Sequence, residues 1–191
     1  MAATPTPTPM MRQYLELKEK YQDSIMFFRL GDFYEMFFDD AKLASKELEL
    51  TLTGKDCGLS ERAPMCGVPY HAASAYISRL IEKGYKVAVC EQLTDPALSK
   101  GLVERDVIRI VTPGTVADPS QLDEKSACYV LCVAFVGKAA ALAYADVSTG
   151  ELIAHLLNDA QRTLRDELMR IRPREIVTND MSKLTPHLGE T

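Results

Sequence analysis

Three observations in the sequence predict an α/β protein made of two modules. Strand-like apolar runs alternate with amphipathic helical segments over residues 9–111. Three strand-like runs, a helix and a fourth strand follow over residues 129–178. The polar stretch 118–126, which contains a proline, separates the two series and is typical of a linker between domains. We therefore expect a disordered tail at 1–9, a first domain at 10–117, this linker, and a second domain at 127–191.

The first module opens with a helix and a buried strand. The alternating Thr-Pro start has low complexity and favours an extended, solvated tail. Pro9 can occupy the first turn of a helix that Thr8 caps, and this helix runs to about Tyr21. The apolar run Ile25–Leu30 is short enough for a buried strand, and Gly31-Asp32 predicts a bend directly after it.

The segment that follows this bend, Phe33-Tyr34-Glu35-Met36-Phe37, carries the strongest functional signal. In a strand, Phe33, Glu35 and Phe37 share one face, while Tyr34 and Met36 share the other. An aromatic ring can enter a base stack and a carboxylate can reach a base edge, so Phe33 and Glu35 are candidate binding residues for nucleic acid. The alternative is a half-buried strand with no such role. Tyr34, on the opposite face, is expected in the core.

The rest of the first module predicts short elements separated by turns. Glycine and proline mark the breaks, and Pro113-Gly114 closes the module. The expected elements are a helix begun by Asp39 and Asp40, a strand at 50–53, a loop at 54–62, an irregular stretch at 64–71, a helix at 72–83, and strands at 87–90 and 107–111.

The second module predicts an antiparallel meander followed by a helical crossover. Asp159 begins the helix and Pro173 ends it, so the strand after it should run parallel to one of the others. This order is the opening half of an RNase H-like fold. The chain stops about where the second half would start, so we expect an incomplete domain on a fragment. The expected strands are 129–136, 139–147, 151–157 and 175–178.

Charge and cysteine content limit the function classes. The chain has 22 Lys and Arg against 27 Asp and Glu, a formal net charge of −5. Proteins that hold phosphates nonspecifically usually carry a basic surplus, so DNA contacts by this chain should be weak, local and salt-sensitive. The five cysteines form no C-x-x-C pair. Cys57, Cys66 and His71 have the spacing of no common metal site, so neither a metal nor a disulfide framework is expected.

The sequence also predicts a cytoplasmic protein. The N-terminus lacks the charged start and the apolar run of a secretory signal. No stretch approaches the roughly 18 uninterrupted apolar residues that would span a bilayer. We therefore expect no membrane partner.

Several separated segments match, in order, those of one known family. The chain resembles the N-terminal part of the MutS family of bacterial DNA mismatch-repair proteins. The resemblance continues more loosely from Asp146-Val147-Ser148-Thr149-Gly150 to the end of the chain. It implies a mixed-sheet mismatch-recognition domain followed by an incomplete connector domain. The matching segments are Thr8–Met11, Arg29–Phe37, Gly67–His71, Cys90–Leu93, Val103–Arg105 and Arg109–Thr115.

The resemblance gives roles to individual residues. Phe33 corresponds to the wedge that enters the minor groove at a mismatched or unpaired base, and Glu35 to the group that hydrogen-bonds the displaced base. Wedging a base step apart costs a few kcal/mol, and a mismatch has already lost part of that stacking and pairing. Lys55, Gln92 and Arg105 correspond to positions near the DNA backbone.

Two of these backbone positions leave alternatives open. Relatives often have an arginine where this chain has Lys55, and a lysine keeps the point charge but loses the bidentate fork. Arg105 and Arg109 are four residues apart on an expected strand and should share a face. The neighbouring Glu104 and Asp106 make a solvated edge an equally good interpretation of that segment.

The resemblance also implies partners and missing parts. The partners would be mismatched double-stranded DNA and, through the connector domain, a MutL-type protein at the bacterial nucleoid. ATP and Mg²⁺ would bind a C-terminal ATPase domain that this chain does not contain, since no G-x-x-x-x-G-K-[ST] motif occurs in it. We therefore expect no cofactor and no enzymatic activity. Family members dimerise largely through regions absent here, so a monomer is expected.

Two other function classes remain open. Asp146-Val147-Ser148-Thr149-Gly150 also resembles the phosphate turn of actin-like phosphotransferases, with Asp146 and Glu151 as the only nearby acids, although a β-hairpin explains it more simply. The third class is a protein-interaction module that docks on repair partners without holding DNA. Its support is the acidic charge and the absence of a clamp region.

Overall fold

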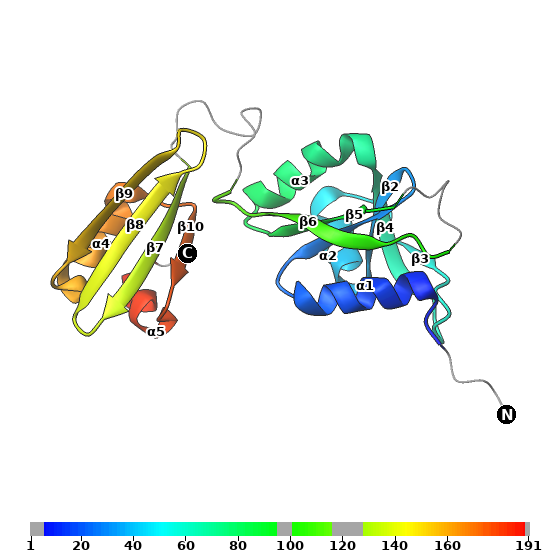
Figure 1. Cartoon of the computed structure of the whole chain (residues 1–191), viewed down its shortest axis with the longest axis horizontal. Helices are drawn as coiled ribbons and strands as arrows, with labels where there is room; N and C mark the ends of the chain where they lie inside the picture. Colours follow the sequence, from blue (N-terminus) through cyan, green and yellow to red (C-terminus); the bar gives the residue numbers. More distant parts are fainter. Residues whose placement is uncertain (1–5, 95–100, 116–127, 190–191) are drawn as a thin grey trace. The chain divides into compact units, whose positions relative to one another are not determined.

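The computed structural model describes residues 6–94, 101–115 and 128–189. The chain divides into two compact units, residues 1–111 and 112–191 (Figure 1). The expected linker at 118–126 and the first five residues of the expected tail lie outside the described residues. Thr112 and Gly114, in the turn expected to close the first module, both hydrogen-bond the Glu175 carboxylate, so this turn makes its contacts in the second unit.

The first unit is a six-stranded mixed sheet in the order β3-β4-β2-β1-β5-β6, with helices on both faces (Figure 1). Strands β1 and β5 are parallel, and every other neighbouring pair is antiparallel. The expected mixed α/β class is therefore confirmed. The strands are β1 Ile25–Leu30, β2 Phe33–Phe37, β3 Thr53–Lys55, β4 Ala63–Pro69, β5 Val87–Gln92 and β6 Arg105–Val111, and the helices are α1 Pro9–Lys20, α2 Phe38–Leu48, the 3₁₀ turn η1 Tyr70–Ala72 and α3 Ala73–Glu82.

Helix α1 begins as its sequence predicts. The Thr8 hydroxyl accepts a hydrogen bond from the Met11 N–H at 3.3 Å, and Pro9 occupies the first turn. The buried side of the helix carries Met11, Tyr14 and Leu17. The Tyr14 ring packs edge-on against neighbouring phenylalanine rings of the sheet, which fixes α1 on one sheet face. Helices α2 and α3 pack together on the opposite face, where the Cys66 thiol contacts the Ala41 carbonyl.

Strand β2 shows the expected alternation. Tyr34 and Met36 are buried on the α2 face, which confirms Tyr34 as a core residue. On the other face Phe33 is 48% exposed, Glu35 is half-buried and Phe37 is fully buried. The alternation is thus correct, but the position of α1 decides which residues of that face are covered.

Strand β4 contradicts the expectation of an irregular stretch at 64–71. Its two prolines lie where the strand has a neighbour on one side only: Pro64 pairs with Gly54 of β3, and Pro69 pairs with Phe33 of β2. A proline that lacks the N–H is tolerated at such positions. The expected strand at 50–53 is also wrong at its boundaries, because the strand is Thr53–Lys55 and includes the start of the expected loop.

The second unit is a four-stranded sheet in the order β10-β7-β8-β9, with helix α4 on one face. The three antiparallel strands, the crossover helix and the final strand parallel to β7 are all confirmed. A short helix and a 3₁₀ turn at the end were not expected. The elements are β7 Tyr129–Val136, β8 Ala139–Asp146, β9 Glu151–Leu157, α4 Ala160–Ile171, β10 Glu175–Thr178, α5 Met181–Leu184 and η3 Thr185–His187.

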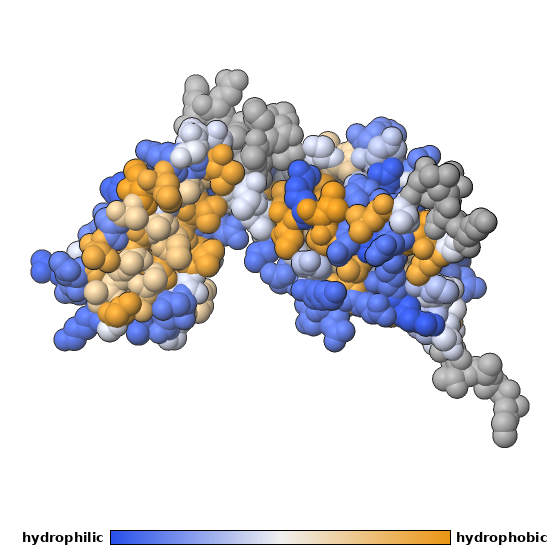
Figure 2. Space-filling model, in the orientation of Figure 1, coloured by the Kyte–Doolittle hydropathy of each residue, from blue (hydrophilic) through white to orange (hydrophobic). Residues whose placement is uncertain are grey.

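The face of this second sheet opposite α4 is left open by the described residues, except where Gly114 packs against Val130 and Glu175. Val136, Leu152 and Leu156 on it are more than two-thirds exposed, and Figure 2 shows the apolar surface over β7, β8 and β9. Strand pairing assigns Glu175 and twelve apolar side chains to this open face. The apolar ones are Val130, Cys132, Ala134, Val136, Ala139, Ala141, Ala143, Ala145, Leu152, Ala154, Leu156 and Val177. No helix among the described residues is long and apolar enough to cross a membrane.

A buried carboxylate completes the first sheet where β1 has a partner strand, β5, on one side only. Strand β2 pairs with β1 only from Phe28 onward, so the Met26 N–H on that side needs another acceptor. Asp40, at the start of α2, supplies it at 2.9 Å and also accepts from the Lys18 ammonium of α1 at 2.9 Å. One carboxylate therefore ties together the strand and the helices on both of its faces.

Replacing Asp40 should destabilise the first unit strongly. Asp40→Ala leaves the buried Met26 N–H without its acceptor. It also takes the carboxylate away from the Lys18 ammonium, which keeps its bond to the Ser24 carbonyl. We therefore expect the free energy of unfolding to fall by about 2–4 kcal/mol. Urea unfolding followed through the β1 amide signals measures this. The control is the adjacent Asp39→Ala, whose 94% exposed side chain pairs with Lys42 and should contribute less than about 1 kcal/mol. Equal effects of the two changes would contradict this role.

Thiol reactivity should separate the cysteines. Burial raises the pKa of Cys66 to about 11 and that of Cys90 to about 12, so at pH 8 their thiolate fractions are about 10⁻³ and 10⁻⁴. Cys132 lies exposed on the open face. We expect iodoacetamide to modify Cys132 in the folded chain, and Cys66 and Cys90 only after urea is added, as measured by mass spectrometry. Rapid modification of Cys90 without urea would show that the first unit opens.

Candidate nucleic-acid interface

The five residues expected to contact DNA all lie on one face of the first sheet. Cross-strand partners share a face, and neighbouring residues in a strand alternate between faces. Phe33 pairs with Leu30, and Glu35 pairs with Phe28 of the same strand. This face is therefore the one that α1 partly covers, because Phe28 belongs to the core cluster with Met11 and Tyr14.

The remaining three residues follow from the same pairing. Lys55 pairs with Ala63, which belongs to that core cluster. Gln92 pairs with Arg105 and lies two residues beyond Cys90, which also packs in the cluster. Phe33 and the Gln92–Arg105 pair lie toward the β1–β2 turn. Lys55 is on β3, and its side chain reaches Glu35 of β2 across β4.

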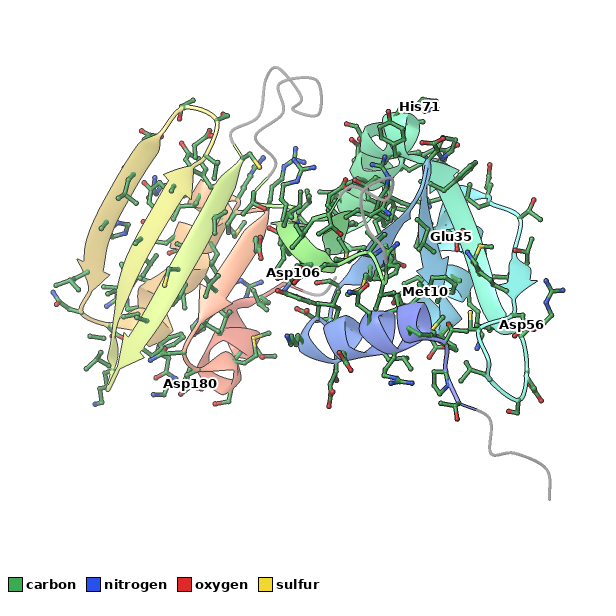
Figure 3. The ribbon with its side chains drawn as sticks, turned by 45° about the vertical axis from the view of Figure 1, so that its right-hand side comes forward. Met10, Glu35, Asp56, His71, Asp106 and Asp180 are labelled. Atoms are coloured by element: carbon green, nitrogen blue, oxygen red, sulfur yellow. The ribbon has the colours of Figure 1, made fainter. Side chains whose placement is uncertain are left out.

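Helix α1 leaves the end of this face uncovered. In the view of Figure 3, Glu35 lies between Met10 of α1 and His71 near the far end of the sheet. Phe37, at the α1 end of β2, is fully buried, whereas Phe33, at the turn end, is 48% exposed. On this face, the side chains of β2 thus become more exposed from Phe37 toward Phe33.

The Phe33 ring is presented at the end of a tight hairpin. Only Gly31 and Asp32 separate β1 from β2, and Gly31 has a φ of +59°, in the left-handed region that favours glycine. Among the described residues no ring-to-ring contact involves Phe33, although Phe27, Phe28, Tyr34 and Phe37 all have one. Its ring is therefore free to stack on another group.

Glu35 and Lys55 form an ion pair across the sheet. The Lys55 ammonium donates to Glu35 Oε2 at 2.6 Å, and the two side chains are 33% and 15% exposed, respectively. Gly67 is the cross-strand partner of Glu35, and a Cβ on it would lie 3.2 Å from the Tyr34 carbonyl oxygen and 3.5 Å from the Glu35 Cγ. The glycine thus leaves room for the glutamate side chain over β4.

Arg105 is buried rather than presented to solvent. It is 8% exposed, and its guanidinium donates to the Arg29 carbonyl at 2.8 Å, to the Val103 carbonyl at 2.9 Å and to Gln13 Oε1 at 3.2 Å. Burial lowers its pKa. A contact between Arg105 and a DNA phosphate would be made by a side chain that already donates to three protein groups, and it stays a prediction. Gln92, opposite Arg105, is half-buried.

The expectation that Arg105 and Arg109 share a face is wrong. A β-bulge interrupts the pairing, so that Cys90 pairs with Val107 while Val89 pairs with Arg109. Adjacent residues of β5 point to opposite faces, so the extra residue in β6 moves Arg109 to the face opposite Arg105. A one-residue insertion of this kind leaves no signal in the local sequence.

A cluster on the opposite face, which sequence reasoning missed, lies directly behind the hairpin. The Arg29 guanidinium lies 3.8 Å from the centre of the Tyr70 ring and 3.5 Å from Glu91 Oε1. The Tyr34 hydroxyl donates to the same carboxylate, and burial together with Glu91 raises the Tyr34 pKa to about 12. We call these four residues, Arg29, Tyr34, Tyr70 and Glu91, the Arg29 cluster. The signal that could have found them is the single charge inside the apolar run 25–30.

In the second unit, the two acids considered for catalysis, Asp146 and Glu151, make hydrogen bonds at the β8–β9 hairpin. Asp146 Oδ1 accepts from the Ser148 N–H at 2.8 Å and the Ser148 hydroxyl at 2.6 Å, which lowers the Asp146 pKa. Glu151 pairs with Asp146 across the strands and accepts from the Tyr129 hydroxyl. Within the described ranges, no three or more His, Cys, Asp or Glu side chains gather in a way that could hold a metal ion.

Comparison with known proteins shows what the chain is similar to. A family model described as MutS domain I matches residues 8–120, and one described as MutS domain II matches residues 128–187. Among curated relatives, the DNA mismatch repair protein MutS of Acetivibrio thermocellus is 60% identical over 174 residues, which are 90% of this chain and 20% of the relative. The protein of the same name from Ruminiclostridium cellulolyticum is 58% identical over 177 residues, 92% of this chain and 20% of the relative. That of Clostridium botulinum is 57% identical over 176 residues.

The domain I match alone covers more than half of the chain, and the second match adds most of the remainder. The chain spans about a fifth of the length of the curated relatives it matches. Its two compact units correspond in order to the two matched domains. The chain therefore belongs to the MutS family and carries that family's domain I followed by its domain II.

Proposed function

We propose that the first unit recognises mismatched or unpaired bases in duplex DNA, with Phe33 as a wedge in the minor groove and Glu35 as the acceptor for the displaced base. The observation that supports this proposal most directly is the placement of the half-exposed Phe33 ring two residues from Glu35 on one open sheet end. Relatives that match nine-tenths of the chain bear the name of a DNA mismatch repair protein.

The wedge would recognise a weakness in the duplex more than the identity of a base. Inserting an apolar side chain between base steps costs a few kcal/mol of unstacking. A mismatched step has already lost part of its stacking and pairing, so the same insertion costs less there. The Phe33 ring then stacks on a base, an interaction worth about 1–3 kcal/mol for aromatic side chains.

Glu35 would act mainly by disfavouring correctly paired DNA. A carboxylate beside phosphates is repelled, and it needs a donor when it is removed from water. A displaced base offers an imino or amino hydrogen that a paired base keeps for its partner. Lys55 donates to Glu35 Oε2 at 2.6 Å, so the carboxylate has a partner within the protein. In our proposal Lys55 also contacts the DNA backbone, together with Gln92 and Arg105.

In our proposal, the other functions of the family belong to the second unit and to regions outside this chain. We propose that the domain II portion contributes to an interaction with a MutL-type partner, and that the chain on its own is neither an ATPase nor a clamp. ATP and Mg²⁺ would bind regions that correspond to the remaining four-fifths of the relatives. Binding of DNA by this chain alone should therefore be weak and should weaken further with salt.

Replacing Phe33 should abolish the preference for mismatched DNA. We expect Phe33→Ala to weaken binding to a duplex with a G·T mismatch or an unpaired thymine by about tenfold or more, because the stacking interaction is lost. Binding to fully paired duplex should change little. Fluorescence anisotropy with labelled duplexes at low salt measures both. Leu52→Ala is the matched control, since Leu52 is 47% exposed in the same unit. An unchanged preference in Phe33→Ala would reject the wedge.

Replacing Glu35 should have the opposite effect on paired DNA. We expect Glu35→Gln to strengthen binding to fully paired duplex by about three- to tenfold, because one repelled charge of about 1 kcal/mol is removed, and so to narrow the preference for a mismatch. The same anisotropy titrations apply. Glu47→Gln is the control, because Glu47 also pairs with a lysine, Lys83, at 2.8 Å. If both variants gained affinity equally, a general charge effect would explain the result and Glu35 would have no specific role.

A further inference from the structure

The position of Phe33 depends on a turn of only two residues. Leu30 and Phe33 are paired across the hairpin, and Gly31 and Asp32 connect them. Phe33 is the first residue of β2, so any change in the turn backbone moves the ring directly. Among the described residues, no side chain packs over the Cα of Gly31, since a Cβ built there would meet nothing within 4 Å. The side chains that restrain the turn therefore lie outside it.

Arg29 contacts this turn from the face opposite Phe33. Its Nε–H donates to the Gly31 carbonyl, while its guanidinium lies over the Tyr70 ring and beside Glu91. The side chain is only 16% exposed, which is low for an arginine at the end of a sheet. A planar guanidinium stacked on a ring and paired with a carboxylate has few alternative rotamers, so it presents Nε to the turn in one geometry.

Two further hydrogen bonds hold the backbone around the turn. The Tyr70 N–H donates to the Asp32 carbonyl at 2.9 Å, and the buried Arg105 donates to the Arg29 carbonyl at 2.8 Å. Carbonyls of residues 29, 31 and 32 are thus each bonded to a group outside the two turn residues. Tyr70 contributes twice, through its backbone to Asp32 and through its ring to Arg29.

We infer that Arg29 is a positioning residue for the Phe33 wedge, and that it sets mismatch preference from behind the sheet through Tyr70 and Glu91. This inference rests on the proposed function. A wedge that is ordered before binding does not lose conformational entropy when it enters the base stack, so a loosened hairpin should reduce binding to mismatched DNA. Fully paired DNA, which does not accept the wedge, should be bound as before.

The alternative role for Arg29 is a direct contact with a DNA phosphate. The two roles differ in what a lysine can replace, because lysine keeps the point charge but loses the planar stack and the Nε donor. They also differ in salt dependence, since removing one phosphate contact makes the slope of log K against log salt less negative by about 0.9. Arg29→Lys and Arg29→Met together therefore separate positioning from charge.

The test uses the 191-residue chain and its Arg29→Lys, Arg29→Met, Tyr70→Ala and Tyr70→Phe variants. We expect Arg29→Lys and Tyr70→Ala to lower the ratio of mismatched to paired affinity about fivefold, and Tyr70→Phe, which keeps the ring, to behave as the unchanged chain. Arg29→Met should lower the ratio without changing the salt slope. An unchanged ratio of mismatched to paired affinity in Arg29→Lys would overturn the inference. So would a salt slope that is less negative by about 0.9 in Arg29→Met.

A second readout does not need DNA. Amide relaxation dispersion of Gly31, Asp32 and Phe33 should show new microsecond-to-millisecond exchange in Arg29→Lys and Tyr70→Ala, with the β5 amides unchanged as evidence of folding. A hairpin as ordered as in the unchanged chain would contradict the positioning role. If the unchanged chain showed no mismatch preference, the proposed function would fail, and the relaxation result would still decide whether Arg29 holds the turn.

Discussion

The packing of helix α1 on one half of one sheet face is the constraint on which the first unit depends. Tyr14 anchors the helix, with ring centroids 5.4 Å from Phe28 and 5.0 Å from Phe37. Because α1 covers the face at Phe37 and not at Phe33, a single strand passes from the core to an exposed end. The same sheet face therefore provides both the hydrophobic stabilisation of the unit and its candidate DNA surface.

Local patterns in the sequence predicted most elements, and the errors have physical causes. Alternation correctly placed Phe33 and Glu35 together, but the burial of Phe37 depends on α1, which is distant in sequence and packs through tertiary contacts. The prolines of β4 concealed a strand because their tolerance depends on which neighbour strand is missing at each one. The bulge that separates Arg105 from Arg109 depends likewise on the partner strand β5. Local periodicity contains no information about partners of this kind.

Three cations of the first unit, two on the candidate surface and Arg29 behind it, are already engaged within the protein. Lys55 pairs with Glu35, Arg29 with Glu91, and the Arg105 guanidinium bonds two carbonyls and Gln13. Together with the formal net charge of −5, this arrangement gives the surface little unspecific attraction for phosphates. In our proposal, the candidate site therefore contributes more to discrimination between duplexes than to strong binding.

The location of the wedge on a strand, and not on a long loop, follows from the work it would have to do. Unstacking a base step costs a few kcal/mol, and a soft support would deform before the DNA did. Strand β2 has neighbours on both sides, β1 and β4, so its first residue shares the rigidity of the sheet. The two-residue turn is the weak point of that support, and the Arg29 cluster lies directly behind it. A sheet with functional contacts on one face therefore requires specific packing on the other.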